Sequence, residues 1–495
     1  MEIKNSFLGG ALKVGGGEVF NQACSFVRNI ILARLISPEN FGIAATFAMT
    51  FSLMEMASNV SVQTLLVQAP DGDGDRFEST GHLLLIWRGI FNAILLLLLA
   101  APLSTLFGVP QARWAFYWVA AIPLLKGFVH LDLSRFQRHM RFTPQVAVDT
   151  ISSLLVTLLA WPLAARLHDY SAMLWLLLLQ AVLYTVGSRL VAERPYHWSW
   201  DRDYLRRYLS FGWPLLINGL LMYGILQGDK FVIGASRRLF AHSVYTLADL
   251  GIYSVTFAVT MAPSALFSNV ASSLILPLLA RWQRDPRQFT KHYRLSTQVL
   301  ALSGLLIAIP FIVAGGWIMV FVFGQKYAAA GTFVGWLGAM WGVRVFRLAP
   351  TQAALALGDS RNSMIANIAR TTALIGVVVA AATGRSLAAI AACAFFGEVL
   401  ATAVCIWRLS ANHRVPSRLS LTPLTICGAG IVLSAIARLG SFGWITSALM
   451  GIILAGACVG GMLLAFADLR ENAHSFLQTL KRSVVPAPAA ESATF

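Results

Sequence analysis

The most regular feature of the chain is an apolar run that recurs from one end to the other. Each run covers about 20 residues, the length that an α-helix needs to cross the hydrocarbon core of a bilayer. Only short polar segments separate the runs. The pattern predicts an all-α polytopic membrane protein with about 14 transmembrane helices. These spans are expected at residues 12–36, 41–67, 81–107, 113–133, 145–167, 171–192, 211–234, 250–279, 296–323, 328–356, 363–383, 386–407, 420–437 and 444–467.

Part of the chain repeats itself. FGIAATFAMT at 41–50 resembles LGIYSVTFAVT at 250–260, with one inserted residue, and each stretch opens a predicted span. Transporters are often built from repeats that place the substrate site between them. We therefore predict two pseudo-symmetric six-helix lobes and two additional transmembrane helices with a cytoplasmic tail. The boundaries are residues 1–195, 196–408 and 409–495.

Composition and charge agree with a membrane location. Hydrophobic residues make up 57% of the chain and charged residues 12%, against about 45–50% and about 25% in soluble domains. The net charge of +16 could indicate a nucleic-acid partner, but cytoplasmic loops of membrane proteins also collect Lys and Arg. With the N-terminus inside, the cytoplasmic segments hold 22 of the 38 basic residues and the outer segments hold 8. We predict a cell inner membrane protein with both termini cytoplasmic and no nucleic-acid partner.

Fourteen charged residues fall within the predicted spans. Each costs about 2.5–3.5 kcal/mol at a helix centre on insertion scales, so most must pair, snorkel or face water. Those close to a predicted span end are explained by snorkelling or local pairing. They are Arg88, Asp132, Asp149 and Arg189.

Five other basic residues are predicted to line a water-filled cavity between the lobes. Two of them, Arg344 and Arg347, are three residues apart and therefore share a helix face. Cations in such a cavity suit an anionic cargo such as phosphate or an acidic sugar. The full set is Arg28, Lys126, Arg344, Arg347 and Arg370.

Three charges are predicted to act in gating or coupling: Glu18, Asp229 and Lys230. Aligning RNIILAR with DKFVIGA through the repeat places Arg28 opposite Asp229. Two roles remain open, an Arg28–Asp229 latch near the periplasmic side or a cation path through Lys230 with Asp229 as its partner. Because neighbours on a helix point about 100° apart, we expect Asp229 to face inward and Lys230 to snorkel outward.

The chain carries no recognisable catalytic motif. DGDGDRFEST at 71–80 resembles a calcium loop but has Arg76 and His82 where Gly and Glu are needed, so a solvated loop is expected. The histidines lack metal-ligand spacing, and no phosphate loop or nucleophile–base arrangement is present. We predict a protein that is not an enzyme, binds no metal or cofactor, and is open to coupling with an H⁺ or Na⁺ gradient.

Several stretches, in consistent order over about residues 5–410, resemble the bacterial polysaccharide transporters, the oligosaccharide-flippase (Wzx-like) branch of the MOP superfamily. This chain departs from the family's short turn in one place, with fifteen residues, ASRRLFAHSVYTLAD, before LGIYSV. The matching stretches are LARLISPENFG at 32–42, VQTLLVQ at 62–68, RFQRHMRFTPQVAVDTISS at 135–153, DYLRRYLSFGWPL, GDKFVIG and LGIYSV between 203 and 255, and ALALGDSRNS at 354–363.

The resemblance implies a non-enzymatic flippase that works by alternating access. Its implied substrate is a polyprenyl-pyrophosphate-linked oligosaccharide for exopolysaccharide, capsule or lipopolysaccharide synthesis. Its implied partners are this substrate, membrane lipids, and polysaccharide polymerase and chain-length machinery. The predicted cavity cations would then hold the pyrophosphate or acidic sugars.

Four other functions are weighed against this one. A multidrug (MATE-like) cation antiporter would use Glu18 as its ion site but leaves the two C-terminal helices unexplained, and a lipid II flippase would be essential. A polytopic glycosyltransferase or polymerase needs a sizeable external loop, whereas the longest predicted one is 235–249. A structural scaffold does not explain the charges within the spans.

Overall fold

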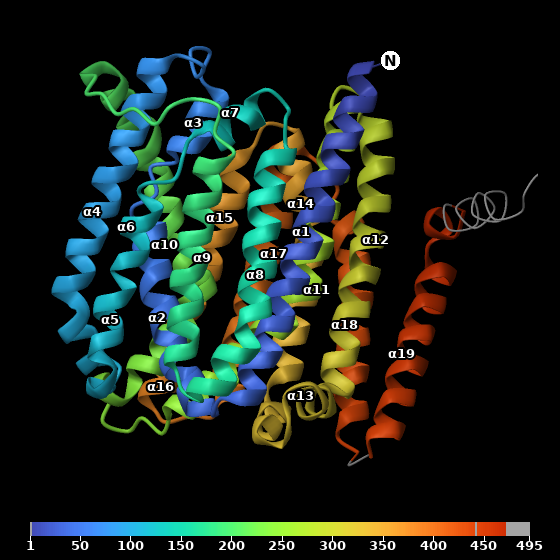
Figure 1. The fold of residues 1–495 in the computed structure, drawn as a ribbon. Coiled ribbons are helices and arrows are strands. Elements are labelled where there is room, and N and C mark those ends of the chain that lie inside the picture. The colour runs from blue at the N-terminus through green and yellow to red at the C-terminus, as the bar shows by residue number, and fades with distance from the viewer. Residues whose placement is uncertain (1, 441–442, 472–495) are drawn as a thin grey trace, which may run out of the picture.

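A computed structural model describes residues 2–440 and 443–471, and every regular element in these ranges is helical (Figure 1). The first elements are α1 Glu2–Leu35, α2 Pro38–Ala57, α3 Val62–Gln68, α4 Asp75–Leu106, η1 Pro110–Ala112 (a 3₁₀ helix), α5 Arg113–Val119, α6 Ala121–Lys126, α7 Asp132–Arg138, α8 Thr143–Leu167 and α9 Ser171–Leu190. The others are α10 Arg202–Leu239, α11 Leu247–Arg281, α12 Pro286–Val313, α13 Gly315–Phe323, η2 Gln325–Thr332 (3₁₀), α14 Val334–Ala356, α15 Ser360–Thr371, α16 Ala373–Ala382, α17 Leu387–His413, α18 Arg418–Arg438 and α19 Trp444–Ala465.

Many of these helices are long and apolar enough to cross a bilayer. In the described part of the chain, 10 candidate spans pass this test, with α15 and α16 counted together. The number rises to 11 if α2 and α3, which meet at an angle of 42°, form one span. The protein is therefore a multi-pass membrane protein. The exact number of 14 spans stays a prediction.

The predicted span over 296–323 is not one helix. The helix α12 ends at Val313, and α13 is a separate short helix at the lower end of the bundle in Figure 1. Pro310 weakens the end of α12 because it lacks a backbone N–H, and Gly315 and Gly316 are poor helix formers. The expectation of a single span here was wrong because length and hydropathy alone do not register these breaks.

The repeat begins the same way in both copies. Ser37 is the N-cap of α2, where its side chain accepts a hydrogen bond from the Asn40 N–H at 3.1 Å. Thr246, at the equivalent position of the second copy, caps α11 by exchanging hydrogen bonds with Asp249 in a capping box. The two copies thus share a helix start as well as a sequence pattern.

The two copies also pack directly against each other, because α2 crosses α11 at two equivalent glycines. A Cβ atom on Gly42 would lie 1.8 Å from the carbonyl oxygen of Leu247, and one on Gly251 would lie 2.0 Å from that of Pro38. Each glycine faces the first turn of the other helix, which is the reciprocal contact that a two-fold relation produces. Only glycine permits this close backbone approach.

Charges from the two copies also meet at the lower end. Arg34, at the end of α1, donates hydrogen bonds to the carbonyl oxygens of Phe321 and Val322 in the last turn of α13, at 2.6 and 2.7 Å. In return, the Lys326 ammonium donates to the carbonyl oxygens of Arg34 and Ile36, at 2.9 and 2.6 Å. Each cation lies at the negative end of a helix from the other half.

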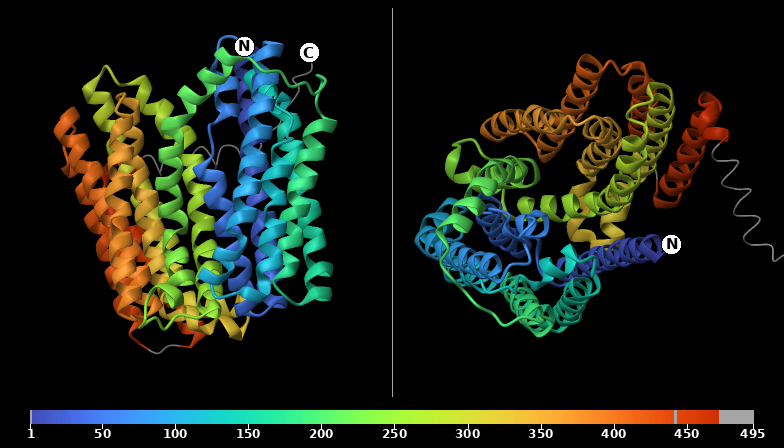
Figure 2. Two further views of the ribbon diagram at one scale, coloured as in Figure 1. Left: turned by 90° about the vertical axis from the view of Figure 1, so that its left-hand side faces the viewer. Right: turned by 90° about the horizontal axis from the view of Figure 1, so that it is seen from above.

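Seen from above, helices α1–α9 gather on one side of the molecule and α14–α18 on the other (Figure 2). The long helix α10 packs against α2, where a Cβ on Gly219 would lie 2.3 Å from the Met56 carbonyl oxygen. Farther along, Gly228 of α10 contacts Leu374 of α16. This helix therefore touches both groups. The boundaries predicted at 195 and 408 stay predictions.

Candidate functional site

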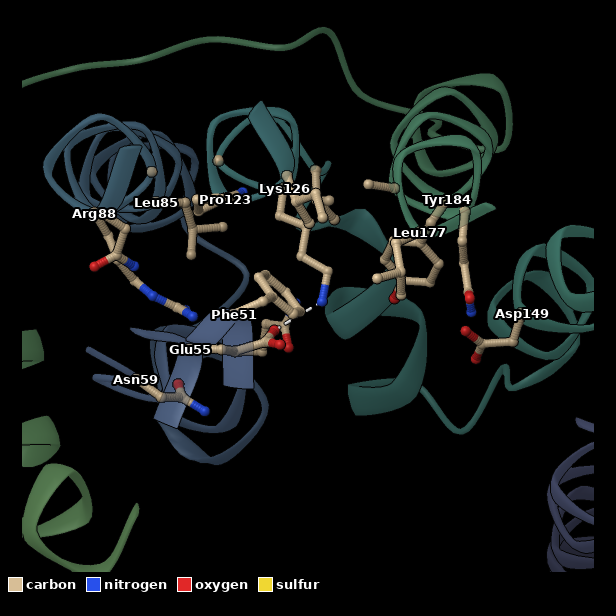
Figure 3. Close-up of a pocket in the computed structure, with 18 residues that line it drawn as sticks. Phe51, Glu55, Asn59, Leu85, Arg88, Pro123, Lys126, Asp149, Leu177 and Tyr184 are labelled. Carbon is tan, nitrogen blue, oxygen red and sulfur yellow. Dashed lines mark hydrogen bonds and ion pairs between the residues drawn. The ribbon is translucent and has the colours of Figure 1, made fainter. Parts of the chain in front are cut away.

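A cavity of about 450 Å³ opens among the helices of the first half (Figure 3). This volume lies within the range of small-molecule binding sites. We call it the amino-terminal cavity. Its polar and aromatic lining comes from the segment of α2 and α3 and from α4, α6, α8 and α9. The lining residues of this kind are Phe51, Glu55, Asn59, Gln63, Arg88, Asn92, Lys126, Asp149, Gln180 and Tyr184.

Lys126, one of the predicted cavity residues, lies in this cavity but is paired. Its ammonium is 2.8 Å from a carboxylate oxygen of Glu55 and lies 4.7 Å from the centre of the Phe51 ring. Both partners of the ion pair keep about a third of their side-chain surface exposed. The pair is therefore accessible to a molecule that enters the cavity.

Arg88 and Asp149, for which snorkelling or local pairing was expected, line the same cavity. The helix α4 begins at Asp75 and α8 begins at Thr143, so both residues lie farther from the start of a helix than the predicted spans indicated. The Arg88 Nε donates a hydrogen bond to the Ser58 hydroxyl at 3.1 Å.

Three other predicted residues meet in the second half around one carboxylate, Glu398 of α17. Arg347 Nε lies 2.6 Å from its Oε1, and Arg370 Nε lies 2.8 Å from its Oε2. Arg344, on the same face of α14 as Arg347, lies 3.8 Å away. We call these four residues the arginine cluster. Three guanidinium groups and one carboxylate leave it with a net charge of +2.

Some hydrogen-bond donors of the arginine cluster have no acceptor among the described residues. The Nη1 atoms of Arg344 and Arg370 are buried and have no hydrogen-bond partner among the described residues. The Arg344 side chain is 21% exposed, whereas that of Arg370 is 4% exposed. Guanidinium groups bind carboxylates and phosphates through paired N–H donors. The arrangement therefore has the donors that suit an anion, with Arg344 as its most accessible member.

Asp229 and Lys230 are both buried. The Asp229 carboxylate accepts a hydrogen bond from the Tyr253 hydroxyl at 2.5 Å, and a space of about 20 Å³ separates it from Arg370. Lys230 is 9% exposed, with its ammonium 4.3 Å from the centre of the Phe257 ring. The expectation that Lys230 snorkels outward was wrong, because α11 covers this face of α10.

Arg28 and Glu18 lie on α1, outside both the amino-terminal cavity and the arginine cluster. One Arg28 nitrogen is buried without a hydrogen-bond partner in the described structure, and exposed Glu18 accepts a hydrogen bond from Gln22 at 3.2 Å. The described residues form no ion pair between Arg28 and Asp229, so the predicted latch is absent from this structure. The predicted cavity residues therefore lie in three places. Lys126 lines the amino-terminal cavity, Arg28 lies on α1, and the arginine cluster contains the other three.

Residues 31–331 match the family described as polysaccharide biosynthesis protein. The chain belongs to this family. It is 23% identical over 329 residues to the succinoglycan biosynthesis transport protein ExoT of Rhizobium meliloti (strain 1021), a match that covers 64% of this chain and 63% of that relative. The match thus spans less than two thirds of the relative's length.

Two solved structures share the fold of this polysaccharide biosynthesis family member. The inward closed conformation of the lipid II flippase MurJ has a TM-score of 0.68 at 12% identity, covering 91% of this chain and 98% of that one. An inward-facing multidrug resistance MATE family transporter of the MOP superfamily has a TM-score of 0.66 at 14% identity, covering 80% and 96%. The family member therefore has a fold like that of these two proteins.

At the upper end of this family member, the acidic loop that we expected to be merely solvated binds three arginines. Asp71 binds Arg207 at 2.7 Å, and Asp73 binds Arg138 at 2.9 Å. Glu78, at the start of α4, binds Arg194 at 3.0 Å. The loop thereby ties α7, α10 and the α9–α10 connection to α4. The sequence contains these opposite charges but does not show which of them meet.

A possible metal site lies beside this loop. The ligand atoms of Glu78, His82 and His130 all lie within 4.8 Å of one another. However, His82 Nε2 already accepts the Leu131 N–H at 3.0 Å, and its Nδ1 lies 3.0 Å from the His197 carbonyl oxygen. Both ring nitrogens are thus committed, and a ligating lone pair is not available. We interpret the group as a structural hydrogen-bonded contact between distant segments. Sequence spacing could not reveal it because His82 and His130 are distant in the chain.

Proposed function

We propose that this protein is a flippase for a polyprenyl-pyrophosphate-linked oligosaccharide, acting in exopolysaccharide, capsule or lipopolysaccharide synthesis at the inner membrane. The observation that carries the proposal is the arginine cluster. A net charge of +2 inside a membrane protein is costly unless an anion compensates it. The diphosphate of such a substrate supplies that anion, and the family membership favours this cargo over a drug cation.

In this proposal, Arg344 makes the first contact with the diphosphate because its side chain is the most exposed of the three. The unpartnered Nη1 atoms of Arg344 and Arg370 then donate to phosphate oxygens. The polyprenyl tail remains in the bilayer, where its transfer into water would be unfavourable. Binding and positioning are the whole task, so no bond is made or broken.

Alternating access would move the six-helix lobes, residues 1–195 and 196–408, against each other within a 14-span protein. The glycine crossing of α2 and α11 and the Arg34 and Lys326 caps would hold the lower end closed while the upper, cytoplasmic end admits substrate. Glu18, Asp229 and Lys230 remain the proposed gating or coupling groups for an H⁺ or Na⁺ gradient. A polymerase and chain-length machinery would receive the product on the periplasmic side.

The test is to disrupt the gene and measure both surface polysaccharide and lipid-linked units on the cytoplasmic face. We expect polymer to be lost and lipid-linked units to accumulate. Complementation with Arg344→Gln should restore less than about a tenth of export, because one charge-assisted phosphate contact contributes about 1.5–3 kcal/mol. Arg238→Gln, an equal change at an exposed position on the lower end, should restore export fully. Normal polymer after disruption, in a strain without a second such gene, would overturn the proposal.

A further inference from the structure

The amino-terminal cavity is electrically balanced, unlike the arginine cluster. Arg88 and Lys126 contribute two positive charges to its lining, while Glu55 and Asp149 contribute two negative charges. Lys126 is already neutralised by Glu55 at 2.8 Å. An additional anion here would unbalance these charges and would lose hydration. The cavity is thus poorly suited to the acidic cargo that the sequence led us to expect.

The remaining polar lining consists largely of carboxamides. Asn59, Gln63, Asn92 and Gln180 each carry one carbonyl acceptor and two N–H donors. Gln63 and Gln180 have no hydrogen-bond partner in the described part of the protein. Groups that both donate and accept are complementary to hydroxyl groups, which do the same. A ligand rich in hydroxyl groups would satisfy these amides, whereas an apolar ligand would leave them unpaired.

The cavity also offers apolar surfaces beside these amides. Phe51 lies on α2 and Tyr184 on α9, and the close-up shows both side chains near the Lys126–Glu55 pair (Figure 3). Aromatic rings provide flat apolar area, and the tyrosine adds a polar hydroxyl. A pocket with apolar walls and a few placed polar groups is typical of small-molecule sites. A pyranose ring has the matching character, with C–H groups on its faces and hydroxyl groups around its edge.

We propose that the amino-terminal cavity binds an uncharged, hydroxyl-rich sugar residue of the substrate, while the arginine cluster binds its diphosphate. The inference rests on the proposed function for the link between the two sites, but sugar binding itself does not require transport. At about 450 Å³ the cavity holds a short part of the oligosaccharide rather than the whole repeat. An acidic sugar is disfavoured at this place because its carboxylate would break the charge balance.

Binding of two matched probes to the purified full-length protein in detergent tests this. Methyl β-glucoside and methyl β-glucuronoside differ only in the carboxylate, and saturation-transfer-difference NMR detects weak, saturable binding of either. We expect saturable binding of the neutral glycoside and at least about tenfold weaker binding of the acidic one, since the carboxylate would lose hydration and add an unbalanced charge to the cavity. Equal binding of both, tighter binding of the acidic probe, or no saturable signal from the neutral probe would overturn the proposal.

Glu55→Gln provides a sharper readout than loss of binding. It frees the Lys126 charge, so the preference should shift toward the glucuronoside by about tenfold. Glu39→Gln makes the same change at an exposed position in the first turn of α2 and should leave the preference unaltered. A misfolded variant would lose both signals, whereas the inference demands a reversal in their ratio. An unchanged ratio in folded Glu55→Gln would contradict it.

A second pair of variants tests the amides. Gln180→Leu should weaken glucoside binding at least about fivefold because it removes one hydrogen-bonding group from the cavity. Gln111→Leu, at an exposed position in η1, should leave glucoside binding unchanged. Neutral-sugar binding without any effect of disruption on polymer export would overturn the proposed function alone. Loss of export on disruption, with no sugar preference in the purified protein, would overturn the cavity assignment alone.

Discussion

Glu398 is the counter-charge of three arginines in the second half. It is fully buried and faces three guanidinium groups, two of them within 2.8 Å. Removing one partner of a buried ion pair leaves the others uncompensated, which costs more than the pair itself contributes. The carboxylate therefore matters both for folding and for holding the three arginines in place.

We expect Glu398→Gln to lower the free energy of unfolding by about 3–5 kcal/mol, because it leaves three buried cations without a counter-charge. Denaturant titration of the purified protein in detergent measures this. Glu39→Gln, an exposed acid on α2, should change stability by less than about 0.5 kcal/mol. Similar stability of the two variants would show that the cluster is solvated rather than buried.

Asp132, which the sequence placed at the end of the predicted span 113–133, lies in the structure at the start of α7, outside the candidate spans. It has a comparable role at the upper end of the bundle. Burial raises the pKa of its carboxyl, but hydrogen bonds from Arg135 and from the backbone N–H groups of Arg194 and Glu193 outweigh this, so the pKa is lowered overall. A lowered pKa in the folded state stabilises the protein at pH values above the unfolded-state value of about 3.9. That contribution is lost as the pH falls through the folded-state pKa.

Asp132→Asn should therefore destabilise the protein by about 2 kcal/mol at pH 7 and by progressively less below about pH 4. Unfolding curves of both proteins between pH 7 and pH 3 provide the comparison. Exposed Asp203, in the first turn of α10, is the matched control, and its Asn variant should show no such convergence. A difference that does not shrink at all between pH 4 and pH 3 would mean that packing, not charge, is lost.

Sequence spacing identified some of these residues but not their partners. The separation of three residues placed Arg344 and Arg347 on one face, and both reach Glu398. Glu398 itself could not be named because it lies 51 residues from Arg347, and only the packing of α14 against α17 joins them. The place of Arg88 in the amino-terminal cavity could not be predicted, because it depends on where α4 begins.

At the scale of the element, the crossing of α2 and α11 is the most sharply defined contact. The carbonyl oxygens of Leu247 and Pro38 occupy the places where side chains on Gly42 and Gly251 would be. A backbone atom at such a distance cannot move aside without shifting its whole helix. The crossing therefore fixes the separation of the two helices.

Gly42→Ala and Gly251→Ala should each destabilise the protein by at least about 1–3 kcal/mol, since both force α2 and α11 apart. Gly451→Ala is the control, because no atom lies within 4 Å of the place of its Cβ on α19. Helix propensity alone would make that change neutral or stabilising. Thermal unfolding in detergent distinguishes the three variants, and an alanine tolerated at Gly42 would contradict the close approach.

Helix starts were easier to predict than helix breaks. Ser37 and Pro38 form the start of α2 through adjacent residues alone, which is the kind of signal that a sequence carries. The end of α12 at Val313 and the separate α13 were missed, because an apolar run stays apolar where the backbone turns. The repeat identified α2 and α11 as equivalent, although similarity alone did not show that they touch.

At the scale of the whole molecule, the two halves are joined at the lower end by an exchange of helix caps. Arg34 of α1 donates to a carbonyl oxygen at the end of α13, and Lys326 donates to a carbonyl oxygen at the end of α1. Because each half supplies a cation to the other, breaking one contact should loosen the interface that the second contact needs. The two residues are therefore expected to be energetically coupled.

A double-mutant cycle with Arg34→Gln and Lys326→Gln measures this coupling. We expect each change to cost about 1–2 kcal/mol and the pair to deviate from additivity by at least 0.5 kcal/mol. The control cycle combines Arg34→Gln with Arg294→Gln. Arg294, on α12, forms its ion pair with Asp468, so the effects of these two changes on stability should be additive. Additivity in the first cycle as well would mean that the two caps act independently.

The buried charge of the arginine cluster has an electrical consequence. Moving one elementary charge fully across a membrane involves about 2.3 kcal/mol per 100 mV. To the extent that the second half travels along the membrane normal, an empty cluster is drawn toward the negative, cytoplasmic side. Under the proposed function, a diphosphate in the cluster would cancel this force by cancelling the charge. The resting voltage would then return the empty carrier without opposing the loaded one.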